Sequence, residues 1–250
     1  MSTTINLTKL ELKDFKSLIN TNSKFLTRAT LVFKNNTLTI EQLSDSAICL
    51  LSTTINLRDF NTDLEPIKVC VELKTLNNYL KNFKDSLKIE VEQTLEHQIF
   101  KKELVLSDST NKFILECFDI NEYKNSVQIE YMSDFEINFK KVYEFLKCFS
   151  KTDRVNLNVE GEKLLLECNK SKILLSENDL LKREFENITS VYSVEFLKKL
   201  NALKDFDCKI HLMNKSHWPL CLEFSMGRYE NGENLSMALK IHIAPIYDNS

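Results

Sequence analysis

The stretch FKKVYEFLKCFSKTDR, residues 139–154, holds the pattern from which the rest of this chain can be interpreted. Its apolar residues recur at helical spacing, so one stripe of the helix must be buried: Val142, Phe145, Leu146 and Phe149. Its lysines gather on a different face: Lys140, Lys141, Lys147 and Lys151. Glu144 is the single acid between residues 140 and 151, whereas solvated helices usually mix their charges. On one helix alone, such a face is ordinary solvated surface.

Three other segments repeat this combination of an apolar stripe and outward lysines. They lie near residues 12–19, 74–84 and 194–204. Their inward positions are Leu12, Phe15, Leu18 and Ile19, then Leu76, Leu80 and Phe83, then Leu197, Leu200 and Leu203. The four helices begin about sixty residues apart, and β-rich runs follow each one. We therefore expect an α+β fold of four strand-helix-three-strand repeats forming two similar domains, a periodicity typical of rings and arrays.

The segments between the helices have sequence patterns that predict β-strands. We expect strands at residues 27–33, 38–41, 47–57, 67–73, 87–93, 99–106, 112–117, 155–159, 164–168, 172–176, 208–213, 220–225 and 238–243. The strand before the last helix is only weakly signalled, because Ile188 and Val191 are flanked by polar residues without alternation. Polar residues without a period suggest a connector, so the expected domains are 1–118 and 133–250, joined by residues 119–132.

The composition argues against several classes of protein. Charged residues make up 28% and hydrophobic residues 43% of the chain, as in soluble globular proteins, and no apolar run is long enough for a membrane helix. The seven cysteines are scattered and never spaced C-x-x-C, so we expect buried free thiols in a reducing compartment. The four histidines are isolated, and no catalytic pattern emerges. We therefore expect no metal, no cofactor and no enzymatic activity.

The positive charge of the chain is concentrated on the four helices. Residues 13–24, 74–84, 140–151 and 195–204 carry a net +10, so the remainder carries −13. A phosphate backbone is the natural partner, because lysine neutralises phosphates without reading bases. No aromatic residue for base stacking and no set of arginines for guanine recognition is evident among the lysines, which favours sequence-independent contact with duplex DNA. The candidate DNA-binding residues are Lys13, Lys16, Lys74, Lys81, Lys84, Lys140, Lys141, Lys147, Lys151, Lys198, Lys199 and Lys204.

Three short segments resemble stretches of a known family. Residues 42–50, QLSDSAICL, are similar to that family's SMDSSHVSL; residues 243–245, IAP, to its closing LAP; and residues 219–224, PLCLEF, to its PLVVEY. The family is that of proliferating cell nuclear antigen (PCNA), the DNA sliding clamp. Together with the layout, the resemblance covers essentially the whole chain. It implies a homotrimeric ring with helices lining a central hole and sheets outside.

The same resemblance implies a function and a set of partners. The chain would encircle duplex DNA, act as the processivity factor of a DNA polymerase, and recruit replication and repair proteins through short peptide motifs. A clamp loader would place it on DNA, in the nucleus if the organism is a eukaryote. The peptide pocket would comprise Leu43, Ala47, Ile48, Leu50, Val127, Ile129, Pro219, His242, Ala244 and Pro245. The subunit contact would pair one edge strand, with Phe113, Leu115 and Cys117, against another with Ile173 and Leu175.

The sequence also departs from the family's pattern. No Gly or Pro stands near Val127 and Ile129, Ala47 replaces a histidine, and His242 stands where an aromatic residue is usual. Trp218 suits either a partner anchor or core packing. Two alternative functions stay open. One is a checkpoint-type or viral clamp-like subunit, hetero-oligomeric or without a closed ring. The other is an enzyme whose basic face holds an anionic substrate, which a compact polar pocket at the lysines would support.

Overall fold

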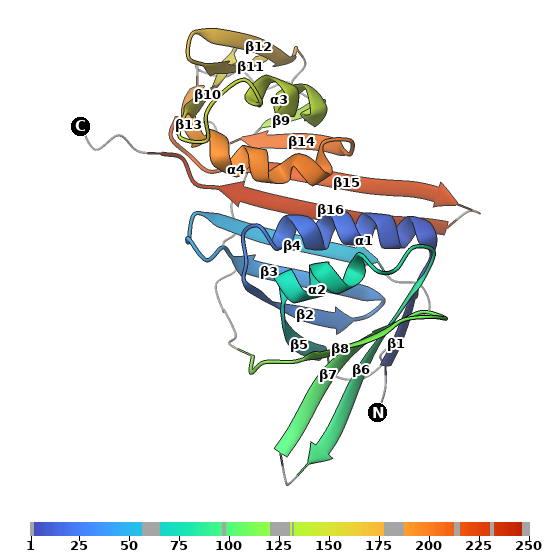
Figure 1. Cartoon of the computed structure of the whole chain (residues 1–250). Coiled ribbons are helices and arrows are strands. Elements are labelled where there is room, and N and C mark those ends of the chain that lie inside the picture. The colour runs from blue at the N-terminus through green and yellow to red at the C-terminus, as the bar shows by residue number, and fades with distance from the viewer. Residues whose placement is uncertain are drawn as a thin grey trace. The chain divides into compact units, whose positions relative to one another are not determined.

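The computed structural model describes residues 3–56, 66–96, 99–120, 131, 133–177, 188–212, 216–230 and 233–246 (Figure 1). Its elements follow the order strand, helix, three strands four times over. This confirms the predicted α+β fold of four repeats. Within the described ranges, no helix is long and apolar enough to cross a membrane.

The first two repeats run from β1 to β8. They comprise β1 (Thr3–Leu7), α1 (Lys9–Asn22), β2 (Arg28–Lys34), β3 (Thr37–Leu43), β4 (Cys49–Asn56), β5 (Ile67–Glu72), α2 (Leu73–Leu80), β6 (Leu87–Glu96), β7 (Ile99–Ser107) and β8 (Lys112–Glu116). Helix α1 begins with a capping box, in which the Thr8 backbone N–H donates to the Glu11 carboxylate. Between β2 and β3, Asn35 and Asn36 both adopt positive φ, as a two-residue hairpin turn requires.

The last two repeats run from β9 to β16. They comprise β9 (Ser133–Ile137), α3 (Phe139–Leu146), β10 (Arg154–Glu160), β11 (Lys163–Cys168), β12 (Ser171–Ser176), β13 (Ile188–Ser193), α4 (Val194–Lys199), the 3-10 helix η1 (Leu200–Leu203), β14 (Asp207–Leu212), β15 (Leu220–Glu230) and β16 (Glu233–Ile243). The side chain of Asn138 caps α3 by accepting from the Lys141 N–H. Gly161 has φ of 61° in the β10–β11 turn, where the sequence predicts a turn.

The chain divides into two compact units. The first comprises Met1–Asp45, Leu51–Lys124 and Met226–Ala238, and the second comprises Ser46–Leu50, Asn125–Ser225 and Leu239–Ser250. In the first unit, neighbouring strands follow the orders β1-β6-β7-β8 and β5-β2-β3-β4. In the second they follow β12-β11-β10-β13 and β16-β15-β14-β9. The uninterrupted domain boundaries expected from the sequence stay a prediction.

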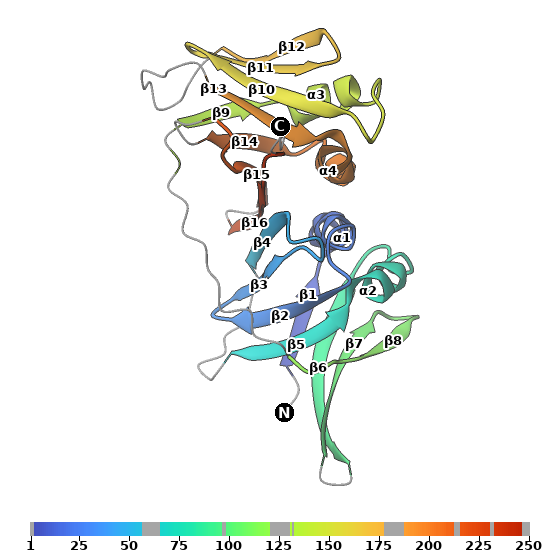
Figure 2. The same cartoon turned by 90° about the vertical axis from the view of Figure 1, so that its left-hand side faces the viewer.

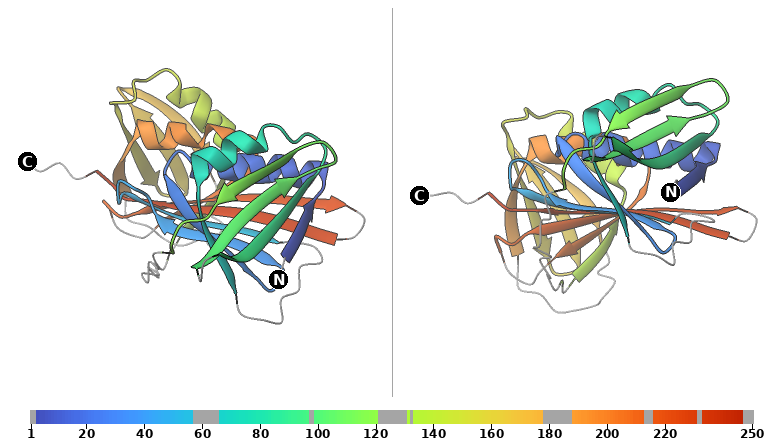
Figure 3. Two further views of the ribbon diagram at one scale, coloured as in Figure 1. Left: turned by 60° about the horizontal axis from the view of Figure 1, so that its bottom comes forward. Right: turned by 90° about the horizontal axis from the view of Figure 1, so that it is seen from below.

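Each unit packs a pair of helices against its strands. In the first unit α1 lies beside α2, as Figures 2 and 3 show, and α2 contacts β5 and β8. In the second unit α3 contacts α4. The apolar helix stripes close the core: Leu12, Phe15, Leu76 and Leu80 are buried in the first unit, and Val142, Leu146 and Leu197 in the second. Each such side chain contributes about 1.5–3 kcal/mol of hydrophobic stabilisation.

Helices α2 and α3 are shorter than the apolar pattern predicts, whereas α1 is longer than the expected segment 12–19. Helix α3 ends at Leu146, so Lys151 lies in the turn before β10. The Asp153 carboxylate accepts from the Ser150 N–H at 2.8 Å, a bond that competes with continuation of the helix. Phe149, expected on the helical stripe, instead lies beyond the helix and packs edge-to-face on Phe145, with ring centroids 4.9 Å apart. Helix α2 likewise ends at Leu80.

Some strands differ from the sequence-based expectation. Strands β1 and β9 were not predicted, although Ile5 and Leu7 of β1 and Phe135 and Ile137 of β9 are buried. Strand β13 alternates regularly, and its inward residues are Ile188, Ser190 and Tyr192. Ser190 is both polar and buried, which hides the apolar alternation in the sequence. Its hydroxyl accepts from the His217 N–H at 2.9 Å, the kind of partner that a buried polar group requires.

Candidate nucleic-acid interface, partner site and subunit edges

The candidate DNA-binding lysines fall into two groups by exposure. Those that are exposed are Lys13, Lys74, Lys81, Lys84, Lys140, Lys141, Lys147 and Lys151. Those that are half-buried are Lys16, Lys198, Lys199 and Lys204. An exposed ammonium group can reach a phosphate without losing interactions inside the protein. The exposed group is therefore better suited to contact DNA.

Two half-buried lysines tie the helix pairs together. The Lys16 ammonium on α1 donates to the Phe83 carbonyl, three residues past the end of α2. The Lys198 ammonium on α4 donates to the Phe149 carbonyl, three residues past the end of α3. In each unit, one helix thus supplies a cation beyond the C-terminus of its partner, where carbonyl groups lack helical partners and the helix dipole is negative. Burial lowers the pKa of Lys16.

Several exposed or half-buried lysines have a nearby acid. The Nζ–carboxylate distances are 2.8 Å for Lys147 to Glu144, 3.5 Å for Lys140 to Asp205 and 3.3 Å for Lys199 to Glu195. The Glu144 partner raises the pKa of Lys147, which therefore stays charged. Ion pairs at such exposed sites contribute only about 0.2–1 kcal/mol. A phosphate can therefore replace the carboxylate at little cost.

Aromatic rings lie beneath some of these lysines, which the sequence did not predict. The Lys147 ammonium is 5.1 Å and the Lys204 ammonium 5.8 Å from the centroid of the Tyr143 ring. The Lys199 ammonium is 4.6 Å from the Phe196 ring. The spacing i, i+4 could have indicated the Tyr143–Lys147 pair. The pairing of Lys204 with Tyr143 depends on how α3 and α4 pack, so sequence alone could not give it.

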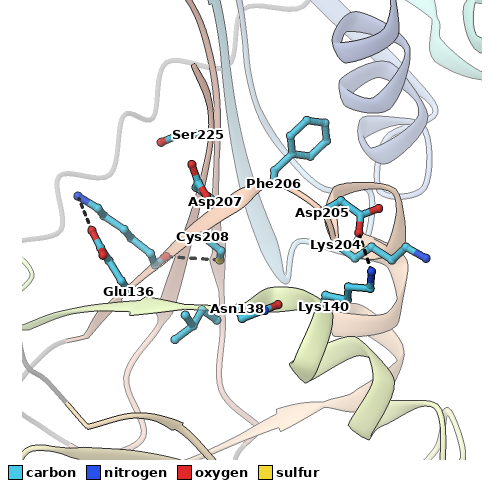
Figure 4. Close-up of a pocket in the computed structure, with 11 residues that line it drawn as sticks. Glu136, Asn138, Lys140, Lys204, Asp205, Phe206, Asp207, Cys208 and Ser225 are labelled. Carbon is cyan, nitrogen blue, oxygen red and sulfur yellow. Dashed lines mark hydrogen bonds and ion pairs between the residues drawn. The ribbon is translucent and has the colours of Figure 1, made fainter. Parts of the chain in front are cut away.

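A hollow of about 740 Å³ lies next to Lys140 and Lys204 (Figure 4). Its lining includes three acids, Glu136, Asp205 and Asp207, and three lysines, Lys140, Lys204 and Lys209. Two of these lysines form ion pairs with acids of the lining, so the hollow does not concentrate positive charge. Cys208 also lines it, and burial raises the pKa of its thiol well above the usual value. A protonated thiol is a poor nucleophile, so this lining gives no support to the enzyme alternative.

Part of the expected peptide pocket comes together in the second unit. The Ala244 N–H donates to the Ile48 carbonyl at 3.0 Å, which places segment 46–50 beside the residues that follow β16. Ile48 has 38% of its surface exposed, whereas Pro245 is buried. Ala47 is exposed with φ of 56°, and Leu50, Pro219, His242 and Ala244 are half-buried. Leu43 is 38% exposed and belongs to the first unit. Val127 and Ile129 lie outside the described residues.

Trp218 is an exposed residue and does not belong to the core. Its side chain is 40% exposed, and its backbone carbonyl accepts from the buried Tyr192 hydroxyl at 2.8 Å. The neighbouring His217 N–H donates to the Thr189 carbonyl, and the Ile246 N–H donates to the Val191 carbonyl. Residues 216–218 and 244–246 therefore both lie along the outer side of β13. The structure thus favours a surface role for Trp218 over core packing.

The structure brings together two histidines that looked isolated in the sequence. The Tyr131 hydroxyl is 2.5 Å from His242 Nδ1, and its ring centroid is 5.9 Å from that of His211. His211 Nδ1 is 2.6 Å from the Asp134 carboxylate and Nε2 is 2.8 Å from the Glu223 carboxylate. Burial lowers the pKa of His242. These contacts arise because β9, β14, β15 and β16 are neighbours, a pairing that residue spacing does not encode. Among the described residues, no cluster of three or more His, Cys, Asp or Glu side chains could hold a metal.

The strands expected at the subunit contact are both sheet edges: β8 follows β7 at the end of one order, and β12 precedes β11 at the end of another. The expected residues Phe113 and Leu115 face their own unit. The Phe113 ring stacks on Tyr79 at 4.8 Å, and Leu115 is buried. Cys117, Ile173 and Leu175 are half-buried. The outward residue that the sequence-based set omitted is Ile114, which is 49% exposed.

Comparisons with known proteins identify the fold. No protein-family model and no curated protein matches the sequence. Among solved structures, PCNA from Entamoeba histolytica matches with a TM-score of 0.76 at 16% identity, covering 98% of both chains. A PCNA2–PCNA3 complex from Sulfolobus tokodaii matches with a TM-score of 0.75 at 20% identity, covering 98% of this chain and 99% of that one. A. fulgidus PCNA bound to the C-terminal region of FEN-1 matches with a TM-score of 0.75 at 15% identity, over 99% and 100%.

Proposed function

We propose that this chain, which has the fold of the PCNA sliding clamps, is itself a DNA sliding clamp. Copies of it form a ring around duplex DNA, hold a DNA polymerase on its template, and recruit other proteins through short peptides. The observation that carries the proposal is the charge distribution. Lysines recur on or just after the helix of every repeat, with a net +10 in these segments of a chain whose total is −3.

The DNA contact rests on phosphates. The exposed lysines are long, mobile point charges, and their weak ion pairs with acids are easily exchanged for phosphates. Such contacts position a protein without reading sequence, so direct affinity is low and salt-sensitive. Retention on DNA therefore comes from encirclement, after a clamp loader has placed the ring. In a eukaryote this work would take place in the nucleus.

Partner proteins dock on the apolar surface around Ile48. Ile48 is exposed, Ala244 and Pro245 lie next to it, and the one tryptophan of the chain, Trp218, is exposed beside β13. An extended peptide with an aliphatic residue and aromatic anchors suits such a surface. The similar structure from A. fulgidus holds the C-terminal region of FEN-1, which is consistent with peptide binding by this fold.

Assembly uses the open edges β8 and β12, giving a homotrimer. Unpaired strand edges are a liability unless another chain pairs with them, and a head-to-tail contact closes into a ring when its rotation permits. The PCNA2–PCNA3 complex is a case of association between chains of this fold. Light scattering at tens of micromolar should give the mass of three chains. A dimer would favour the viral alternative, and a monomer would contradict the ring.

The DNA-facing role is tested with two matched triple variants. Replacing Lys81, Lys147 and Lys151 by Ala should weaken binding to a short duplex equally for all sequences, because it removes phosphate contacts. The slope of log affinity against log salt should fall by about 0.9 for each phosphate that is no longer neutralised. The control replaces Lys34, Lys163 and Lys170, which are also exposed but lie outside the helices. Fluorescence anisotropy measures both. If the slope of log affinity against log salt is equal for the two variants, the helices do not form the DNA-facing surface.

A further inference from the structure

Helices α2 and α3 occupy equivalent places in the two units, and one exposed position differs between them. Both helices have eight residues, and each has a lysine as its C-cap, Lys81 in α2 and Lys147 in α3. Three positions before that lysine stands Asn78 in α2 and Glu144 in α3, and both are exposed. The lysine-rich helix segments of the two units carry the same net charge. The units therefore differ in where the charge is placed.

The Glu144 carboxylate holds the Lys147 ammonium with both of its oxygens, at Nζ–Oε distances of 2.8 and 2.9 Å. In α2 the equivalent Lys81 ammonium donates to the side-chain carbonyl of Asn78 at 2.9 Å. An amide oxygen is neutral, so it directs the lysine without cancelling its charge. The helical neighbour of Lys147 thus neutralises it, whereas the helical neighbour of Lys81 does not.

Tyr143 gathers a second lysine at the same place. The Lys147 and Lys204 ammonium groups lie 5.1 and 5.8 Å from the centroid of the Tyr143 ring, within the range of cation–π attraction. The hydrogen bond from Lys147, followed by the charges of Lys204 and Lys140, lowers the pKa of Glu144. Glu144 therefore stays ionised, with three lysines around it. Lys140 is itself drawn toward an acid of the nearby hollow, as Figure 4 shows.

An ionised acid among three lysines competes with a DNA phosphate for the same donors. Carboxylate and phosphate oxygens both accept charge-assisted hydrogen bonds from an ammonium group. A phosphate that binds Lys147 must displace Glu144 or bind beside a like charge. We propose that Glu144 is an internal counter-anion that weakens the phosphate contacts of α3 relative to those of α2, an inference that rests on the proposed sliding clamp.

This arrangement suits a ring that moves along DNA. A sliding ring must exchange its phosphate contacts repeatedly, and each lysine that leaves a phosphate loses a charged partner. Lys147 regains Glu144 as soon as the phosphate departs, so leaving costs it less than it costs Lys81. Exposed ion pairs are weak enough to exchange in this way. The second unit therefore supplies the mobile contacts, and the first unit supplies the firmer ones.

Exchanging the two residues between the helices tests the proposal. Glu144→Asn should raise the affinity for a short duplex by about two- to fivefold per site, the range expected for the loss of one exposed ion pair. The slope of log affinity against log salt should steepen by about 0.9 for each phosphate gained. Asn78→Glu should change both quantities in the opposite direction. Fluorescence anisotropy of the labelled duplex, titrated at several salt concentrations, measures them.

Glu162→Asn is the matched control, because Glu162 is an exposed acid in the β10–β11 turn and its replacement changes the net charge by the same amount. It should leave the affinity and the salt slope nearly unchanged. Equal gains for Glu162→Asn and Glu144→Asn would mean that net charge alone is responsible, and would overturn the counter-anion. An unchanged salt slope in both Glu144→Asn and Asn78→Glu would overturn it as well.

The triple alanine variant of Lys81, Lys147 and Lys151 separates this inference from the proposed function. If Glu144→Asn has no effect while the triple variant weakens binding, the helices face DNA and the counter-anion is wrong. If neither changes binding, the helices do not face DNA and both conclusions fail. Light scattering and circular dichroism check that each variant keeps the mass and the fold of the wild type, so that a change in affinity reports on the DNA contact.

Discussion

Strands β12 and β13 are the two edges of one four-stranded sheet, and the chain treats them in opposite ways. On β13 other segments supply the cover: the Ile246 N–H donates to the Val191 carbonyl at 2.8 Å, and Ser216 and His217 contact Thr189. On β12 the Leu174 carbonyl accepts from a lysine ammonium. A main-chain cover blocks the edge permanently, whereas a lysine at an edge deters accidental pairing and can move aside. The difference is the one expected if β12 pairs with another chain in the proposed ring.

The largest expected effect comes from removing the support of the covered edge. Tyr192 is almost fully buried, and its hydroxyl donates to the Trp218 carbonyl at 2.8 Å. Tyr192→Ala should lower the free energy of unfolding by about 3–5 kcal/mol, because it leaves a large cavity and removes this bond. Tyr192→Phe, which keeps the ring, should lower it by about 1 kcal/mol. Urea denaturation of the dissociated chain measures both.

The open edge supplies the comparison for this experiment. Leu174→Ala should lower the free energy of unfolding of the dissociated chain by much less than Tyr192→Ala, because Leu174 is only half-buried. Its main effect should be on assembly. Equal losses of stability for the two alanine variants would show that the covered and the open edge do not differ in the way described.

The next effect concerns the segment that covers β13, whose neighbour Ile48 is exposed. Ile48→Asp should weaken binding of a peptide that carries an aliphatic and two aromatic anchors by about 2 kcal/mol, because a charge replaces a central apolar contact. Isothermal calorimetry measures the binding. Ile114→Asp, at an exposed apolar residue of edge β8, should instead disturb assembly and leave peptide binding intact. A folded Ile48→Asp variant with unchanged affinity would place the peptide site elsewhere.

The smallest effect concerns pH and His242, which lies near the end of β16, just before the segment that covers β13. Burial, with Lys240 and His211 nearby, lowers the pKa of His242 from its usual 6.5. As pH falls below 6.5, the unfolded chain takes up this proton before the folded chain does, so stability is lost through that window. His242→Gln should flatten part of this loss, by a fraction of the Tyr192→Ala effect. Thermal unfolding between pH 7.5 and 5 checks it, with exposed His217→Gln as the control. An unchanged pH profile in the His242→Gln variant would show that His242 does not cause this loss of stability.

Much of the fold could be predicted because it depends on local patterns in the sequence. The helical stripes, the Asn35-Asn36 turn and the strand spacing gave the four repeats. The prediction was less accurate where a polar residue is buried, as at Ser190 in β13, or where a turn side chain ends a helix, as Asp153 does after α3. In the site, the lysines could be listed in advance. The outward direction of Ile114, in contrast with the inward Phe113 and Leu115, could not.

Sequence by itself determined the number of repeats, the charge of their helices and the apolar residues of the core, because these depend on periodicity and composition within a few turns of chain. Tertiary structure alone decided which lysines are exposed and which tie helices together, since Lys16 and Lys198 find their carbonyl partners 67 and 49 residues away. It also decided which sheet edges are covered. Hydrogen bonds between distant segments settle both outcomes, and such bonds depend on how the elements pack and not on the spacing of residues along the chain.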